Sequence, residues 1–184
     1  WAVFLIGCDD PTQKQKPQQQ EEKLPTFHEM YKTLRLNALE IDPGEAGIPI
    51  ENDDEVFAVL IEETNNNLTS SLFVTKNGNA SLYMSNGGGI LGGISDNEAK
   101  TNASLLVSQA QEIYAEYERA DAYPVPKNGY IRFYFVTNEF VYTLEDETTK
   151  IASRYPDLHQ LRLTARLVLQ GLYRIKKEQQ KATS

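Results

Sequence analysis

Hydrophobic positions along the chain follow two different spacings, and these separate predicted helices from predicted strands. Apolar residues recur at steps of three and four, the spacing of a helix with one apolar face, in the segments 27–38, 99–117 and 158–175. Continuous or alternating apolar runs predict strands at 56–64, 70–75, 80–85, 130–136 and 140–144. Asn77–Gly78 separates the second and third of these strands and predicts a tight hairpin, because both residues tolerate positive φ.

Local signals mark where the helices begin. Thr26 with Glu29, and Ser95 with Glu98, have the spacing of a capping box, in which side chain and backbone at a helix start bond each other. We expect the last helix to begin near Pro156.

The order of these elements predicts an α+β fold. It runs helix, three strands, helix, two strands, helix, which favours a two-layer domain with an antiparallel sheet of about five strands. The first three strands would form a meander and the last two a hairpin, with helices packed mainly on one face. A longin- or roadblock-like layout has this element order, but such an analogy carries no function.

An apolar run and a small residue precede the single cysteine of the chain. The sequence WAVFLIGC resembles the end of a bacterial lipoprotein signal peptide, with Leu5 three positions before Cys8 and Gly7 directly before it. The resemblance implies that Cys8 is lipidated and anchors the protein to a membrane of the bacterial cell envelope. The alternative is a buried edge strand with a free thiol, which would place the domain in the cytoplasm.

Four segments follow from these patterns. Residues 1–8 are predicted to be a signal-peptide remnant with its lipobox. Residues 9–24, rich in Gln and charged side chains, are predicted to be a disordered polar tether. Residues 25–178 would form one α+β domain, and 179–184 a disordered tail.

Charge and composition exclude several partners. The 184-residue chain has a formal net charge of -8 and a pI near 4.8, which argues against nucleic acid and against electrostatic attraction to anionic lipid. One cysteine allows neither a disulfide framework nor a cysteine metal cluster.

The stretch SNGGGILGGIS, residues 85–95, is dense in glycine between a predicted strand and a predicted helix. Its glycines, followed by Ser95, are Gly87, Gly88, Gly89, Gly92 and Gly93. A phosphate cradle usually has a nearby cation, and no Lys or Arg occurs from Ser85 to Glu98. We interpret the stretch first as a crossover turn that needs glycine backbone angles. The alternative is a loop that binds a neutral ligand or a peptide.

The strand at 130–136 offers a second candidate surface. Tyr130, Arg132 and Tyr134 share one face of this strand, which Tyr142 of the next strand would continue. Tyr and Arg are enriched where proteins bind one another, so this face is a candidate partner site. The alternative is that the N-terminal helix covers it.

The sequence predicts no catalytic residues, metal ligands or cofactor. His28 and His159 lie on different predicted helices, and His28–Glu29 lacks the second histidine of the zinc-protease motif. Acidic pairs such as Glu62–Glu63, and the clusters 53–55 and 145–147, are expected to be solvated at strand or loop ends.

Four stretches, NGNASLYMSNGGGILGG, LRLNAL, VFAVLIEE and YIRFYFVT, resemble a family of uncharacterised bacterial proteins. Its members share a glycine, a small residue, Ser-Leu-Tyr and a Gly-Gly-Gly-hydrophobic-hydrophobic-Gly-Gly run. The similarity covers roughly residues 34–143, with a departure at Asn79. It supports the domain and implies no activity and no functional residues.

These observations favour a lipid-anchored, non-catalytic interaction module of the cell envelope. It would bind a protein or small-molecule partner through the glycine loop or the tyrosine face. The alternatives are a hydrolase-type enzyme with a site near the glycine loop, and an acidic inhibitor or immunity-type protein for a basic toxin.

Overall fold

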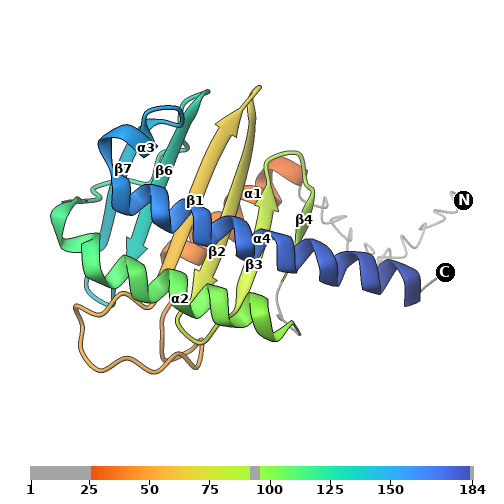
Figure 1. Ribbon diagram of the computed structural model, residues 1–184, viewed down its shortest axis with the longest axis horizontal. Helices are drawn as coiled ribbons and strands as arrows, with labels where there is room; N and C mark the ends of the chain where they lie inside the picture. Colours follow the sequence, from red (N-terminus) through yellow and green to blue (C-terminus); the bar gives the residue numbers. More distant parts are fainter. Residues whose placement is uncertain (1–25, 92–95, 183–184) are drawn as a thin grey trace, which may run out of the picture.

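The computed structural model describes residues 26–91 and 96–182, which form an antiparallel sheet with helices on both faces (Figure 1). The seven strands lie in the order β4-β3-β2-β1-β6-β7-β5. They are β1 (Ala58–Asn65), β2 (Leu68–Thr75), β3 (Ala80–Met84), β4 (Gly89–Ile90), β5 (Glu118–Arg119), β6 (Tyr130–Val136) and β7 (Val141–Glu147). The predicted α+β class, the meander β1–β2–β3 and the hairpin β6–β7 are confirmed. The sheet has two strands more than predicted, because the two-residue strands β4 and β5 pair at its edges.

The helices are α1 (Phe27–Leu39), α2 (Asn97–Ile113), α3 (Ile151–Arg154) and α4 (Pro156–Ala182), with a 3-10 turn, η1, at Tyr114–Glu116. Figure 1 shows α2 and α4 side by side on the near face of the sheet, with α1 on the far face. Two of the three long helices therefore pack on one face, and α1 packs on the other. No described helix is long and apolar enough to span a bilayer.

Side chains cap the starts of α1 and α2, and the cap of α2 differs from the predicted one. Thr26 and Glu29 form the predicted capping box, each side chain bonding the other's backbone N–H. The N-cap of α2 is Asp96, whose carboxylate accepts from the Ala99 amide at 3.0 Å. The prediction that Ser95 and Glu98 form a capping box there is wrong, because the helix starts one residue later. Ser95 itself lies outside the described residues.

The last helix begins at Pro156, as predicted, and continues to Ala182. Helical structure therefore extends past residue 178, into the segment expected to be a disordered tail. α4 runs antiparallel to α2, since Arg174 near its end bonds Asp96 and Glu98 at the start of α2. Gly171 allows the two helices to touch, because a Cβ at this position would lie 2.3 Å from Cβ of Ala99.

Each face of the sheet has its own core. The α2/α4 face buries aliphatic and phenyl side chains, among them Val59, Ile61, Leu106, Phe133, Phe135 and Leu161. The α1 face buries residues from α1, from the loop before β1 and from the sheet, among them Tyr31, Leu39, Ile48, Phe57, Leu60 and Tyr134. Alternate residues of β1 and β6 point into the two cores, so both central strands are buried on both sides.

Candidate binding groove

A groove of about 150 Å³ lies between α1 and the β3–β4 hairpin. Met30, Tyr31 and Leu34 of α1 form one wall. Residues 82–84 of β3, the glycines 87–89 and Leu91 form the other. The groove therefore lies at the edge of the sheet where β4 is the last strand.

Apolar, flexible side chains dominate this groove. Both methionines of the chain, Met30 and Met84, line it. Met30 is 45% exposed and Leu91 is 64% exposed, so the groove presents apolar surface to solvent. Methionine has three rotatable bonds and a polarisable sulfur, which lets such a surface adapt to different apolar partners.

The glycines have structural roles as well as a place in the groove. Gly87 has φ of +90°, and its amide donates to the Met84 carbonyl at 2.9 Å, so it closes the turn after β3. A Cβ on Gly89 would lie 2.5 Å from the carbonyl oxygen of Leu82, so pairing of β4 with β3 requires glycine here. Gly88 lines the groove beside them. Gly92, Gly93 and Ser95 lie outside the described residues.

The start of α2 is filled by side chains of the chain itself. Asp96 accepts from the Ala99 amide, and this bond, aided by Arg174, lowers the pKa of the Asp96 carboxyl. Arg174 lies 3.0 Å from Asp96 and 2.9 Å from Glu98. Protein carboxylates therefore hold the place that a phosphate cradle would offer to a ligand.

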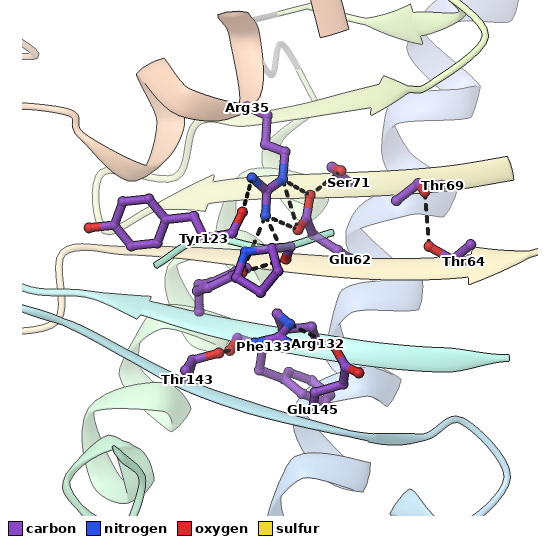
Figure 2. A network of polar contacts seen from close by, with 12 residues as sticks. Arg35, Glu62, Thr64, Thr69, Ser71, Tyr123, Arg132, Phe133, Thr143 and Glu145 are labelled. Carbon is purple, nitrogen blue, oxygen red and sulfur yellow. Dashed lines mark hydrogen bonds and ion pairs between the residues drawn. The ribbon is translucent and has the colours of Figure 1, made fainter. Parts of the chain in front are cut away.

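A buried ion pair fixes the α1 wall of the groove (Figure 2). Arg35 is 4% exposed, and Glu62 of β1 is fully buried. Nε of Arg35 donates to both carboxylate oxygens of Glu62 at 2.8 and 3.0 Å, and its Nη2 donates to Oε2 at 2.7 Å. The expectation that Glu62 is solvated is wrong, because it lies on the central strand of the sheet under α1.

Hydroxyl and carbonyl groups complete this polar network. Ser71 donates to Glu62 at 2.7 Å, and the Tyr31 hydroxyl lies 2.8 Å from the Ser71 hydroxyl. Arg35 also donates to the carbonyls of Tyr123 and Pro124 at 2.7 and 3.0 Å. The network thus joins α1, the sheet and the segment before β6, which holds the groove wall in one position.

Burial within this network changes the acidity of two tyrosines. Tyr134 donates its hydroxyl proton to the Pro124 carbonyl at 2.7 Å, and it is fully buried. Desolvation raises the pKa of Tyr134 to about 12. Desolvation, together with the nearby Glu62 carboxylate, also raises the pKa of Tyr31 to about 12. Both phenols therefore stay protonated near neutral pH.

The predicted tyrosine face does not form one exposed surface. Tyr134 is buried on the α1 face, as in the alternative where the N-terminal helix covers it. Arg132, on the same side, is paired with Glu145, and Tyr130 is half-buried. Tyr142 lies on the opposite face, with its ring 5.0 Å from that of Tyr114.

The other sequence candidates lie away from the groove. His28, on α1, is exposed, and His159, on α4, is half-buried. Neither histidine lines the groove, and none of the acidic clusters does. Across residues 26–91 and 96–182, no group of three or more His, Cys, Asp or Glu could hold a metal ion. Cys8 lies outside the described residues.

Geometry in the described part of the chain thus points to the groove as the candidate site. Sequence reasoning placed Gly87, Gly88 and Gly89 there, but it missed Met30, Met84 and the supporting pair Arg35–Glu62. Comparisons with family models, with curated proteins and with solved structures find no match to this chain.

Proposed function

We propose that this protein is a non-catalytic binding module whose groove takes an extended, apolar segment of a partner protein. The observation that supports this most is an apolar groove with both methionines of the chain beside an edge strand. In strand addition, main-chain hydrogen bonds supply affinity, and side-chain pockets supply specificity.

The geometry of the edge suits such a partner. Within residues 26–91 and 96–182, β4 pairs with β3 alone and ends the sheet, so its outer side faces no other strand. From Ser85 to Leu91 the chain carries no charge and no proline, the features that usually discourage strand addition. Glycine has no side chain to shield the backbone, so the backbone stays accessible to a partner strand.

The size of the groove favours a peptide over a larger organic ligand. Its volume of about 150 Å³ is below the roughly 300–1,000 Å³ of typical small-molecule sites. It is large enough for one or two apolar side chains of a strand whose remaining side chains point away. No contact in the groove supports the hydrolase or the inhibitor hypothesis.

The setting proposed for this module is the bacterial cell envelope, with a lipid anchor on Cys8. Its support is the apolar run and the small residue before that cysteine. The tether predicted from the sequence over 9–24 would let the domain reach a partner that lies away from the membrane surface.

A charge placed at the mouth of the groove tests this function. Met30→Glu should weaken binding of fluorescein-labelled hexapeptides that alternate Val or Leu with Thr by about tenfold, because a carboxylate replaces apolar contact. Fluorescence polarisation across a panel of these peptides measures it. Met30 is 45% exposed, so the substitution leaves the fold intact.

Leu36→Glu is the matched control. Leu36 lies on the same helix and is 41% exposed, but it does not line the groove. The proposal requires that the wild-type protein binds a peptide of the panel and that Leu36→Glu binds it equally well. It fails if no peptide binds, or if the two variants weaken binding equally.

A further inference from the structure

A second pocket, of about 270 Å³, lies on the α2/α4 face, between α4 and the sheet. Its floor consists of Ile61, Leu72, Leu82 and Ile131, from four neighbouring strands. Arg162, Ala165, Arg166 and Leu169 of α4 form its wall. Figure 1 shows the end of the β1–β2 hairpin projecting beyond α4, and the pocket lies where these strands and the helix meet.

The mouth of this pocket carries a cation with no counter-ion among the residues that the structure describes. Arg162 is anchored, since its Nη2 donates to both carboxylate oxygens of Glu63 at 3.1 and 3.0 Å. Arg166 lies one turn further along α4, is exposed, and makes no ion pair, hydrogen bond or ring contact with any described residue. Two arginines and one glutamate leave a net charge of +1 at the pocket.

This arrangement is exceptional among the seven arginines of the chain, all of which the structure describes. Arg119 stacks over the ring of Phe140, 3.5 Å from its centroid. The arginines that bond a carboxylate are Arg35, Arg132, Arg154, Arg162 and Arg174. On a protein of net charge -8, Arg166 is the one arginine with neither a carboxylate nor a ring contact among the described residues, and it lines an apolar pocket.

We propose that this pocket binds a free aliphatic carboxylate, such as a medium-chain fatty acid. Arg166 binds the carboxylate, and Arg162, whose Nε bonds neither Glu63 nor the Thr148 carbonyl that its Nη1 contacts at 3.5 Å, adds a second donor. The aliphatic chain lies over the floor of Leu and Ile side chains. The volume is just below the roughly 300–1,000 Å³ of drug-sized sites, which suits a chain of a few methylenes.

The proposal is independent of the peptide groove. The groove is uncharged and lies against α1, whereas this pocket is positively charged and lies against α4. Loss of peptide binding in Met30→Glu would leave the pocket unchanged.

The test is a titration of the full chain with octanoate below its micelle-forming concentration, followed by calorimetry and by amide shifts in NMR spectra. We expect one site, with shifts centred on Ser70, Leu72 and Arg166. Octanol, which has the same chain without the charge, should bind about tenfold more weakly. Equal binding of octanol would overturn the proposal, as would the absence of octanoate binding.

Two variants and one lipid surface complete the test. Arg166→Gln should weaken octanoate about tenfold, whereas Lys177→Gln, the same charge change at an exposed site on the same helix, should leave it unchanged. If both substitutions weakened octanoate binding equally, the proposal of a specific site at Arg166 would be wrong. Binding to phosphatidylglycerol vesicles without binding to octanoate would show that the cation meets a lipid headgroup, and it would contradict a free carboxylate.

Discussion

The two faces of the sheet are held by different chemistry. On the α2/α4 face, leucine, valine and phenylalanine side chains fill the space, and no buried ion pair lies among the described residues of its core. On the α1 face, tyrosine and aliphatic side chains surround the Arg35–Glu62 pair. Hydrophobic burial is non-directional, whereas a bidentate ion pair requires a particular distance and angle.

This difference assigns different tasks to the two faces. The α2/α4 face supplies stabilisation from apolar surface removed from water. A buried ion pair adds little net stability, because desolvation of both charges offsets their attraction. Its contribution here is position: it fixes where α1 lies on the sheet, and therefore the width of the groove between α1 and β3. The two faces should accordingly respond to different kinds of substitution.

The largest effect is expected on the α1 face. Glu62→Ala should lower the free energy of unfolding by about 3–5 kcal/mol, because the Arg35 cation stays buried without its counter-ion. Guanidinium unfolding followed by circular dichroism measures the loss. Glu62→Gln, which keeps the shape and removes the charge, should show most of it.

Removal of both charges is the control. Arg35→Met combined with Glu62→Met should recover much of the stability, since a buried pair replaced by apolar side chains is often nearly neutral. The same double variant should weaken peptide binding at the groove, because α1 loses its fixed position. If the double variant were as unstable as Glu62→Ala, the claim that the ion pair positions α1 without adding much net stability would be wrong.

On the α2/α4 face, volume and not charge should decide the outcome. Leu161 is fully buried between α4 and the sheet. Leu161→Ala should cost about 3 kcal/mol of unfolding free energy through the cavity it leaves. Leu161→Met, of similar volume, should cost less than about 1.5 kcal/mol. If Leu161→Met were as destabilising as Leu161→Ala, the two faces would no longer differ, because a shape-conserving change would be as harmful here as Glu62→Gln is on the α1 face.

The smallest effect is expected at alkaline pH, where tyrosines of both faces ionise, two of them on the α1 face. The folded-state pKa of Tyr31 and Tyr134 is about 12, against an ordinary value of 10.0. Their contribution to stability is therefore complete below pH 10 and is lost as the pH rises towards 12, because the unfolded chain releases these protons first. We expect the free energy of unfolding to fall by about 1–2 kcal/mol per phenol over this range.

The measurement compares unfolding at pH 9 and pH 11.5 in the wild-type protein and in Tyr134→Phe. Tyr134→Phe removes one titrating group, so its free energy of unfolding should fall less between the two pH values. At pH 9 this variant should be less stable than the wild type, because it lacks the hydrogen bond to the Pro124 carbonyl. A decline as steep as that of the wild type would show that Tyr134 ionises as freely in the folded protein as in the unfolded chain.

Local signals account for the elements that sequence reasoning predicted correctly. β6 has the predicted bounds, Tyr130–Val136, because alternating aromatic and aliphatic side chains define a strand without reference to the rest of the chain. The capping box at Thr26 and the start of α4 at Pro156 depend on neighbours within a few residues. The two-residue strands β4 and β5 have no such signal, since only their pairing partners make them strands.

The Arg35–Glu62 pair was missed for the same reason. Arg35 lies between two leucines on a predicted amphipathic helix and was assigned no role, and Glu62 stands beside Glu63, so that pair is expected to be solvated. One signal was present: Glu62 is in phase with Ala58 and Leu60, on one face of an otherwise apolar strand. The groove could not be predicted, because its walls meet only after α1 has docked on the sheet.

The two edges of the sheet also differ, and this limits how the molecule can assemble. β5 consists of Glu118 and Arg119, both exposed, and charged edge strands resist pairing with other strands. β4 consists of Gly89 and Ile90 and carries no charge. Fibre growth requires two receptive edges on every subunit, and this sheet offers one. We therefore expect association through β4, with a partner strand or with a second copy, to end as a closed pair.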